Sequence, residues 1–283
     1  MVIFFEHGRL GNQLFQYCGL RHYFPGHKLV FLGCEDLQRH FESVDARFIP
    51  KNTLGLWFPF SLLRRIVLFL VAARLLGRIT EERDGEVFKL SVRNGLFWNI
   101  YVPIGVYFHH RDIVDQIRSE PNLKPDLLNV ALDWLKRKGV DPDSCSPVFV
   151  HVRRGDYLHW PSDEFPAVLD LAWYMRAMKA MQEKIKNPVF ILMSDDHFYL
   201  RDVFEESDGL LISDNPPEID MALMSLCHSG ILSASSFAWW GAFYARSNQK
   251  VNATFLAPKY WVGHRTKKWY PANFRTNWIT YLE

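Results

Sequence analysis

The sequence has few cysteines, and none of them has the paired spacing that metal sites use. Its four cysteines are far apart and form no CxxC pair: Cys18, Cys34, Cys145 and Cys227. This pattern predicts reduced thiols in a reducing compartment and argues against a zinc site or a disulfide framework. The chain also lacks a strong charge of either sign. A formal net charge of +2 argues against a protein that binds nucleic acid chiefly by neutralising phosphates.

Long apolar runs are absent as well. A membrane-spanning helix needs about 20 apolar residues, and the most apolar segment, 66–73, is much shorter. Arginines flank this segment on both sides, so it is either a buried core helix or a helix lying in a membrane interface. No basic region or apolar leader precedes the apolar strand at 2–5, which predicts no signal peptide. We therefore expect a cytoplasmic protein, with a peripheral position at the inner face of the membrane left open by segment 66–73.

Hydrophobic residues are abundant: they make up 48% of the chain, including 22 Phe, 11 Tyr and 10 Trp. A chain of 283 residues with this content suits two domains of ordinary size. Segment 141–147 (DPDSCSP) has the composition of a linker. We therefore predict an N-terminal domain at 1–143 and a C-terminal domain at 144–283.

The C-terminal half alternates short apolar runs with helical patterns. Strands are predicted at 148–152, 188–193, 210–212, 230–233 and 251–256, and helices at 170–186, 197–206, 218–227 and 238–246. Continuous apolar strands joined through helices indicate a parallel sheet that is covered on both faces. This half is therefore predicted to be a Rossmann-like α/β domain.

The N-terminal half begins as a βα unit, with a loop that contains Gly8 and Gly11. The two glycines allow a tight turn and a close approach of the backbone to a ligand, although their spacing is not the GxGxxG fingerprint. Asn12 either caps the following helix or faces a ligand. Further elements are predicted as strands at 2–5, 28–32 and within the aromatic run 96–110, and as helices at 14–21, 66–73 and 127–138.

The stretch 148–156 is the most informative in the chain. An apolar strand ends abruptly in Arg153, Arg154, Gly155 and Asp156, at the sheet edge where open α/β folds bind ligands. A guanidinium group can hold two oxygens of a phosphate at once and keeps its charge. An ordinary strand end with a surface salt bridge is the alternative. The tripeptide Arg-Gly-Asp arises by chance often enough that it carries little weight.

Polar side chains also follow two other predicted strands. Ser194, Asp195 and Asp196 follow one strand, and Ser235 and Ser236 follow another. Because all parallel strands end at the same edge, these groups can converge on one crevice. The serines also open a helix, where free N–H groups attract an anion; capping that helix is the simpler role. A metal site at the two aspartates is an alternative, which their opposite directions on a strand disfavour.

Taken in order, these motifs resemble those of the α-1,2-fucosyltransferases of glycosyltransferase family 11, within the wider group of inverting fucosyltransferases. The segments that carry the resemblance are GRLGNQ at 8–13 with FQY at 15–17, HVRRGDY at 151–157, SDD at 194–196, SSFAWWGA at 235–242 and APKYW at 257–261. The resemblance implies a GT-B-like α/β fold: two Rossmann-like domains with the active site in the cleft between them. It also implies an N-terminal acceptor-side domain and a C-terminal domain that binds GDP-β-L-fucose.

The resemblance further implies roles for individual residues. Arg153 would contact the β-phosphate of the leaving GDP, with Arg154 and His151 supporting that site. Asp220 would accept hydrogen bonds from guanine or ribose, and Asn12 would face the donor sugar and phosphate. Strand-end and loop positions would complete the donor site: Gly8, Gly11, Ser194, Asp195, Asp196, Ser235, Ser236 and Phe237.

The implied reaction is a single inverting displacement that moves fucose to the 2-hydroxyl of a terminal β-galactoside, on an oligosaccharide or a lipid-linked glycan. No metal or other cofactor is implied. Asp156 is the first candidate for the general base, with Asp163 and Glu164 as alternatives and an ion pair with an arginine as its other role. The Trp160 and Trp261 regions would contribute to the acceptor side. Another GDP-sugar transferase, or a carbohydrate-binding module without catalysis, is the competing interpretation.

Overall fold

The computed structural model describes residues 1–52, 59–84, 87–97, 99–109, 113, 121–248, 253–268 and 275–283. The chain divides into two compact units, Met1–Asn122 and Leu123–Glu283. The sequence placed the boundary after residue 143 instead. The difference is helix α6 (Pro125–Arg137), which packs against α9 (Pro217–Leu226) and so belongs to the C-terminal unit.

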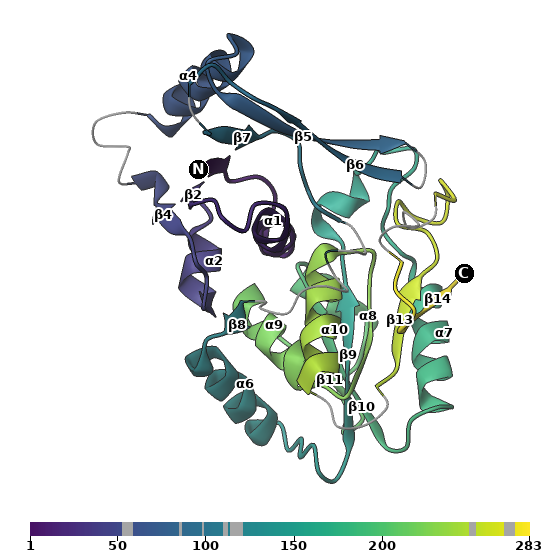
Figure 1. Cartoon of the computed structure of the whole chain (residues 1–283). Coiled ribbons are helices and arrows are strands. Elements are labelled where there is room, and N and C mark those ends of the chain that lie inside the picture. Colours follow the sequence, from purple (N-terminus) through teal and green to yellow (C-terminus); the bar gives the residue numbers. More distant parts are fainter. Residues whose placement is uncertain are drawn as a thin grey trace. The chain divides into compact units, whose positions relative to one another are not determined.

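The N-terminal unit is built on a six-stranded sheet with the order β4-β2-β1-β7-β5-β6 (Figure 1). Neighbouring strands are parallel except for β5 and β6, which form an antiparallel edge. The strands are β1 (Val2–Phe5), β2 (Leu29–Leu32), β3 (Phe41–Glu42, outside this sheet), β4 (Arg47–Ile49), β5 (Gly77–Asp84), β6 (Val87–Arg93) and β7 (Tyr101–Pro103). The helices are α1 (Leu10–Tyr23), α2 (Glu35–His40) and α4 (Phe60–Ala72).

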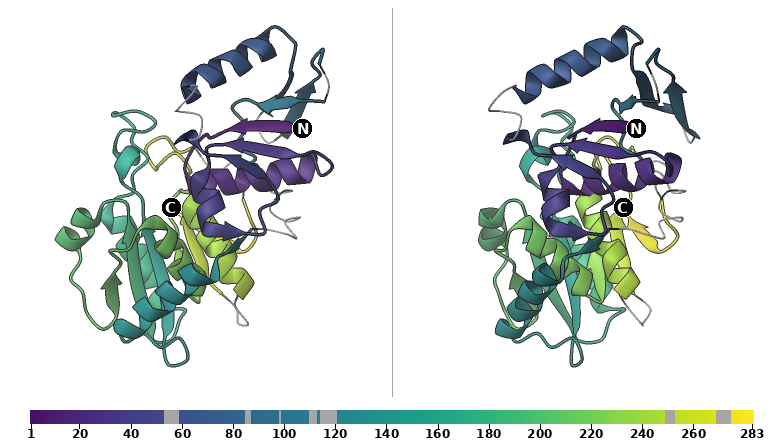
Figure 2. Two further views of the ribbon diagram at one scale, coloured as in Figure 1. Left: turned by 90° about the vertical axis from the view of Figure 1, so that its left-hand side faces the viewer. Right: turned by 60° about the vertical axis from the view of Figure 1, so that its left-hand side comes forward.

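Helices cover both faces of this sheet, as the two views in Figure 2 show for α1 and α4. On one face the rings of Phe4, Phe31 and Tyr17 of α1 pack together, with centroids 5.2 and 6.3 Å apart. On the other face, Phe5 packs in a cluster with Val67 of α4. The strands are apolar at successive positions because both of their faces are buried.

The N-terminal predictions held unevenly. Strands at 2–5 and 28–32 are confirmed, and the helix predicted at 14–21 begins earlier, at Leu10. The aromatic run contributes one short strand, β7, and His110 at its end lies outside the described residues. The β5–β6 hairpin was not predicted. The sequence of β5, GRITEERD, gives little apolar alternation, whereas β6 alternates Phe88, Leu90 and Val92 with polar residues, a strand signal that sequence reasoning missed.

The C-terminal unit has a six-stranded sheet with the order β11-β10-β9-β12-β13-β14, and every neighbouring pair is parallel. Counted along the chain this order is 3-2-1-4-5-6, which is that of the Rossmann fold. Its strands are β9 (Ser146–Val152), β10 (Pro188–Ser194), β11 (Leu210–Ile212), β12 (Ser229–Ile231), β13 (Phe255–Pro258) and β14 (Ile279–Leu282). A further short strand, β8 (Asn122–Leu123), lies at the junction of the two units. The predicted Rossmann-like domain is thus confirmed.

Helices α7 (Leu171–Gln182), α8 (His197–Val203), α9 and α10 (Ser236–Asn248) connect these strands, and a 3₁₀ turn, η1 (Gly155–Leu158), follows β9. Strand β9 is central and is buried from Pro147 to Val152. Its side chains pack with Trp173 and Tyr174 of α7 in one apolar cluster. The core therefore fixes the end of β9, from which Arg153 and Arg154 emerge.

Candidate active site

The candidate site lies at the carboxyl ends of β9, β10 and β12. Strands β9 and β12 are neighbours in the sheet, and successive strands are added outward from them on either side. Open α/β sheets bind ligands at such a switch point, just beyond the strands. The residues predicted after these three strands are the ones the structure brings to this edge.

Arg153 is held by two carboxylates and an aromatic ring. Its Nη1 lies 2.7 Å from Oδ2 of Asp195, and its Nη2 contacts Oδ1 of Asp156. The guanidinium carbon is 5.3 Å from the centre of the Tyr157 ring. Only 13% of the side chain is exposed, so the guanidinium is fixed in place rather than free to swing in solvent. Three-sided contact of this kind preorganises a cation for an anionic ligand.

Gly155 makes this arrangement possible. A Cβ atom at this position would lie 2.4 Å from Oδ2 of Asp195, closer than any real contact. With a larger residue here, the Asp195 carboxylate would have to leave the position in which it pairs with Arg153. The sequence marked Gly155 as part of a motif, and the structure gives its physical reason.

Arg154 is fixed separately from Arg153. Its Nε is 3.1 Å from Oδ2 of Asp196, and its guanidinium carbon lies 3.5 Å from the centre of the Tyr199 ring. Its backbone N–H donates to Oδ1 of Asp195 at 2.9 Å. A cation stacked on a ring and paired with a carboxylate is strongly oriented. Sequence reasoning missed Tyr199, because nothing at the start of a helix distinguishes an aromatic that supports an arginine from one that packs in the core.

The two aspartates after β10 have different partners. Asp195 contacts the loop after β9, whereas Asp196 caps α8 by accepting from the backbone N–H of Tyr199. This hydrogen bond, followed by the contact with Arg154, holds the pKa of Asp196 below its ordinary value. Ser194 is buried, and its Oγ accepts from the N–H of Asp196 at 3.0 Å. Across the described residues, no three His, Cys, Asp or Glu side chains are grouped so that they could hold a metal ion.

His151 joins β9 to β12 beneath the arginines. Its Nδ1 is 2.7 Å from Oγ of Ser233, and its ring centre is 5.6 Å from that of Phe237. Burial, with the charge of Arg153 nearby, lowers the pKa of His151 to about 3, so the imidazole is neutral at pH 7. His151 thus links the ends of β9 and β12 by a hydrogen bond and does not act as a cation. Ser233 was not predicted, since it lies before the serine pair that carried the motif.

The serine pair begins α10. The backbone N–H of Phe237 donates to Oγ of Ser235 at 3.2 Å, and Ser236 is the first residue of the helix. The capping role left open by the sequence is thus present at Ser235. The N-terminus of α10 lies at the same sheet edge as Arg153. The Tyr157 ring, which faces Arg153, donates from its hydroxyl to the carbonyl of Ala234, just before α10, at 2.6 Å.

Asp220 is a buried acid near the end of β11. It lies in the first turn of α9, is 5% exposed, and accepts from the Ser213 hydroxyl at 2.5 Å. Burial raises the pKa of Asp220 to about 8, and the nearby charges of Asp214 and Glu218 act in the same direction. His197 connects the surroundings of Asp196 with those of Asp220. It follows Asp196 in sequence, and its Nδ1 is 3.1 Å from the carbonyl of Ser213, the hydrogen-bond partner of Asp220.

The predicted residues of the N-terminal unit form a separate group. Asn12 lies inside α1 and does not cap it; the N-cap position is Arg9, so the capping alternative was wrong. The Oδ1 of Asn12 is 3.1 Å from Nε2 of His109, a partner that the sequence did not indicate. Gly8 has φ of +82°, and a Cβ there would lie 2.5 Å from Nδ2 of Asn12. Gly11 is buried in the second position of α1.

The alternative candidates for a general base lie on the loop after η1. Asp163 is 2.7 Å from Nδ1 of His159, and both side chains are more than three-quarters exposed. Glu164 is exposed too, and its backbone carbonyl accepts from Arg265. Trp160 is partly exposed beside the Tyr157 ring, at 5.2 Å between centres. None of these side chains contacts the arginine cluster directly.

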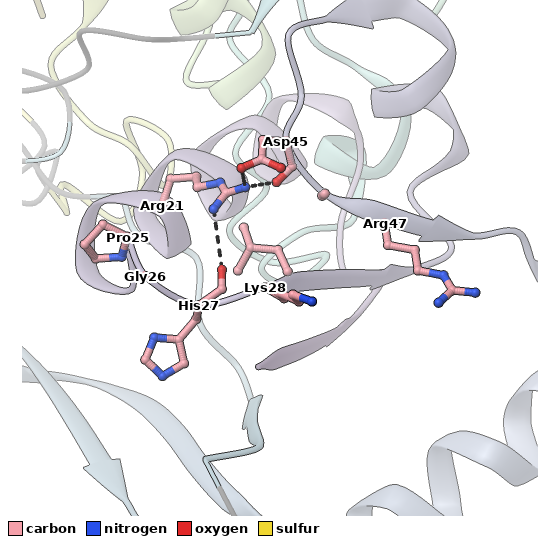
Figure 3. Close-up of a pocket in the computed structure, with 9 residues that line it drawn as sticks. Arg21, Pro25, Gly26, His27, Lys28, Asp45 and Arg47 are labelled. Carbon is pink, nitrogen blue, oxygen red and sulfur yellow. Dashed lines mark hydrogen bonds and ion pairs between the residues drawn. The ribbon is translucent and has the colours of Figure 1, made fainter.

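A hollow in the N-terminal unit lies away from the strand ends (Figure 3). Its volume is about 500 Å³, and it is lined by Arg21, Lys28 and Arg47 among others. Arg21 points at Asp45 and forms an ion pair with it. The hollow is at the start of β2, the opposite end from the one where α/β sheets bind ligands. It therefore contributes nothing to the candidate site.

The fold defines the class of protein. A glycosyl transferase family 9 structure from Veillonella parvula aligns with a TM-score of 0.55 and 10% identity, over 99% of this chain and 85% of that one. The structure of POFUT1 in complex with GDP-fucose aligns with a TM-score of 0.53 and 10% identity, over 90% and 97%. Together with the two parallel-sheet units, these likenesses confirm the predicted GT-B-like fold.

Sequence comparison then gives the family. The model of glycosyl transferase family 11 matches residues 92–283, about two thirds of the chain, and the chain belongs to this family. It is 27% identical to the O-antigen biosynthesis glycosyltransferase WbnK of Escherichia coli, over 92% of this chain and 94% of that protein. It is 26% identical to an alpha-1,2-colitosyltransferase of Escherichia coli, over 90% of each. Galactoside alpha-(1,2)-fucosyltransferase 1 of Bos taurus is 33% identical over 54% of this chain and 44% of its own length.

Proposed function

We propose that the protein transfers L-fucose from GDP-β-L-fucose to the 2-hydroxyl of a terminal β-galactoside, with inversion and without a metal ion. Membership of family 11 and the names of the α-1,2-fucosyltransferase relatives support this proposal. The observation that carries it is Arg153, a largely covered guanidinium fixed by two carboxylates at the switch point of a Rossmann sheet. Such a group is suited to a diphosphate that gains charge as it leaves.

In the proposed reaction, the acceptor oxygen forms a bond to C1 of fucose while the bond from C1 to the β-phosphate oxygen breaks. The electron pair leaves with GDP, and the acceptor proton passes to a general base. Arg153 stabilises the charge that develops on the β-phosphate, and the N-terminus of α10 contributes backbone N–H groups. Asp195 and Asp156 orient the Arg153 guanidinium for this role.

Asp156 can serve this reaction in two ways. As a general base it would take the proton from the acceptor hydroxyl; as a positioning residue it would orient Arg153. Its contact with Arg153 supports the positioning role, while its 54% exposure leaves a free oxygen for the acceptor. The pH dependence of an Asp156→Asn variant separates the two. Loss of the acidic limb of kcat indicates the base, and an unchanged profile at lower kcat indicates positioning.

A different donor is the second candidate. One relative that spans 90% of this chain is named an alpha-1,2-colitosyltransferase, so a colitosyl donor fits the same scaffold. The acceptor is proposed to be a β-galactoside on an oligosaccharide or a lipid-linked glycan, encountered in the cytoplasm. Asp220 would hold the guanine or ribose of the donor from the end of β11, and Asn12 would face the donor sugar from its own unit.

A donor panel tests the proposal. We expect transfer from GDP-fucose, with a Fucα1-2Gal product by linkage analysis, and little transfer from GDP-mannose or UDP-galactose. Turnover should persist in EDTA, since guanidinium and helix N–H groups take the part of a cation. A preference for GDP-colitose would favour the second candidate. Folded protein that binds no GDP-sugar in calorimetry would indicate a binding module, and activity restored only by Mn²⁺ would make Asp195 and Asp196 metal ligands.

A further inference from the structure

The outer face of α4 is apolar although it does not pack in the core. The helix buries one side, through Val67 and Val71, against the N-terminal sheet. Leu62, Ile66 and Phe69 lie on another side at helical spacing, and their exposed fractions are 41%, 40% and 69%. A helix that faces water carries polar residues on its outer side. We call the exposed side chains of Leu62, Ile66 and Phe69 the α4 outer face.

Two further exposed apolar residues lie beside the C-terminal end of α4. The backbone N–H of Leu96 donates to the carbonyl of Arg74 at 2.8 Å, and that of Phe97 to the carbonyl of Leu75 at 2.9 Å. Leu96 is 76% exposed and Phe97 is 47% exposed. Exposed apolar residues from two separate parts of the chain therefore lie at α4 and at its C-terminal end, and a concentration of this kind is a usual mark of an interaction site.

Arginines lie on α4 and at its end. Arg65 is one helical turn from both Leu62 and Phe69, and Arg74 follows the end of the helix. Both are exposed, as is Arg64, which lies in line with Val67 on the other side of the helix. From residue 46 to residue 80 the sequence has six Lys or Arg and no Asp or Glu, in a chain whose net charge is only +2. Within the described parts of the chain, no carboxylate pairs with these three arginines, in contrast to Arg153 and Arg154.

We propose that the α4 outer face docks on the interface of an anionic lipid bilayer, with the arginines at the phosphate level. A basic helix with an apolar face binds in this way, lying in the plane of the membrane. A second copy of the chain fits less well, because a two-fold contact through α4 would bring the same arginines together. In the part of the chain that the structure describes, no helix is long and apolar enough to cross a membrane, so the attachment is peripheral. The proposal is independent of the donor and acceptor proposed above.

Vesicle sedimentation of the whole protein tests the proposal, using phosphatidylcholine vesicles with and without phosphatidylglycerol. We expect binding only to the vesicles with phosphatidylglycerol, and its loss at high salt. Arg65→Gln with Arg74→Gln should weaken binding by about fivefold for each arginine, or about thirtyfold together. Phe69→Ser should weaken it by about tenfold or more. Matched controls on other helices, Met175→Ser and Lys136→Gln with Arg137→Gln, should bind like the wild type.

A fluorescent label gives the position of the contact. In a Cys145→Ser background, where the other three cysteines are buried, Phe69→Cys labelled with an environment-sensitive dye should shift to the blue with anionic vesicles. The same label at Lys136→Cys should not shift. No vesicle binding at low salt would overturn the proposal. So would an oligomer, seen by sedimentation velocity without lipid, that Phe69→Ser dissociates, since the face would then be a subunit interface.

Discussion

Two groups of aspartates follow neighbouring strands of the same sheet, and their surroundings differ sharply. After β10, Asp195 and Asp196 lie against Arg153 and Arg154, and the pKa of Asp196 is lowered. After β11, Asp220 is buried with a serine hydroxyl as its partner, and its pKa is raised to about 8. The charged form is therefore favoured for Asp196 after one strand, whereas Asp220 after the next is largely a neutral acid at pH 7.

The difference bears on the proposed donor site. Carboxylates beside the arginines orient two cations, which in the proposed function contact the diphosphate. A neutral acid at Asp220 can both donate and accept hydrogen bonds, which suits a polar, uncharged group such as a base or a sugar hydroxyl. The sheet edge thus offers adjacent sites of different charge, in keeping with a nucleotide-sugar donor.

The largest effect is expected from substitution of Arg153, the cation held between Asp195 and Asp156. Arg153→Lys keeps the charge but loses the bidentate fork, and should lower kcat by about a hundredfold, or about 3 kcal/mol, with less change in KM. Arg153→Ala should lower it further, because Asp195 and Asp156 then face the diphosphate without their cation. Steady-state transfer from GDP-fucose measures both.

Arg137→Lys is the matched control, since that arginine is exposed and lies in the last turn of α6, outside the motif. It should retain the wild-type kcat, and thermal unfolding should show all variants folded. Wild-type turnover in folded Arg153→Lys and Arg153→Ala would refute the role of Arg153, and Arg154 would become the phosphate-binding arginine.

Much of this cluster could be predicted from the sequence, because it depends on strand ends. The apolar run at 148–152 and the abrupt change to Arg153 indicate a buried strand and its edge, and parallel strands share that edge. What the sequence could not show is which partner each side chain takes. Asp195 and Asp196 are adjacent in sequence but pair with the guanidinium groups of different arginines, and the position of Asp195 depends on the space that Gly155 leaves for its carboxylate.

The N-terminal unit was harder to predict for a related reason. In the β5–β6 hairpin only β6 shows apolar alternation, because β5 is mostly charged and polar. The edge strand β6 is antiparallel in a sheet that is otherwise parallel. The contact of Asn12 with His109 joins residues 97 positions apart, and nothing local specifies it. Helix α6 was assigned to the N-terminal domain because it precedes the linker at 141–147, but it packs against α9 of the C-terminal unit.

A smaller effect is expected at Asp220. An unfolded aspartate titrates near 4, so the contribution of Asp220 to stability is full below about pH 4 and is lost as the pH rises through about 8. The slope is about 1.4 kcal/mol per pH unit, or about 2 kcal/mol from pH 6.5 to 8. Asp220→Asn cannot titrate, so its melting temperature should fall less over this range than that of the wild type, by about 4–8 °C.

The exposed Asp202→Asn variant on α8 is the control for this comparison, and it should follow the wild type. Differential scanning calorimetry at the two pH values gives the midpoints. If Asp220→Asn and the wild type lose stability in parallel, Asp220 is charged in the folded protein at neutral pH, and the contrast with Asp195 and Asp196 disappears.

The smallest effect is expected at Tyr199, whose ring stacks against the Arg154 guanidinium. Its ring lies 3.5 Å from the guanidinium carbon of Arg154, and its backbone N–H, which Leu and Phe retain, donates to Asp196. Tyr199→Leu removes the cation–π contact, worth about 1 kcal/mol, and should raise the Kd for GDP by about fivefold. Tyr199→Phe keeps the ring and should change the Kd by less than about twofold. Calorimetric titration with GDP distinguishes them; equal weakening in both variants would assign the effect to the hydroxyl, and no weakening in either would mean that Arg154 is held by Asp196 alone.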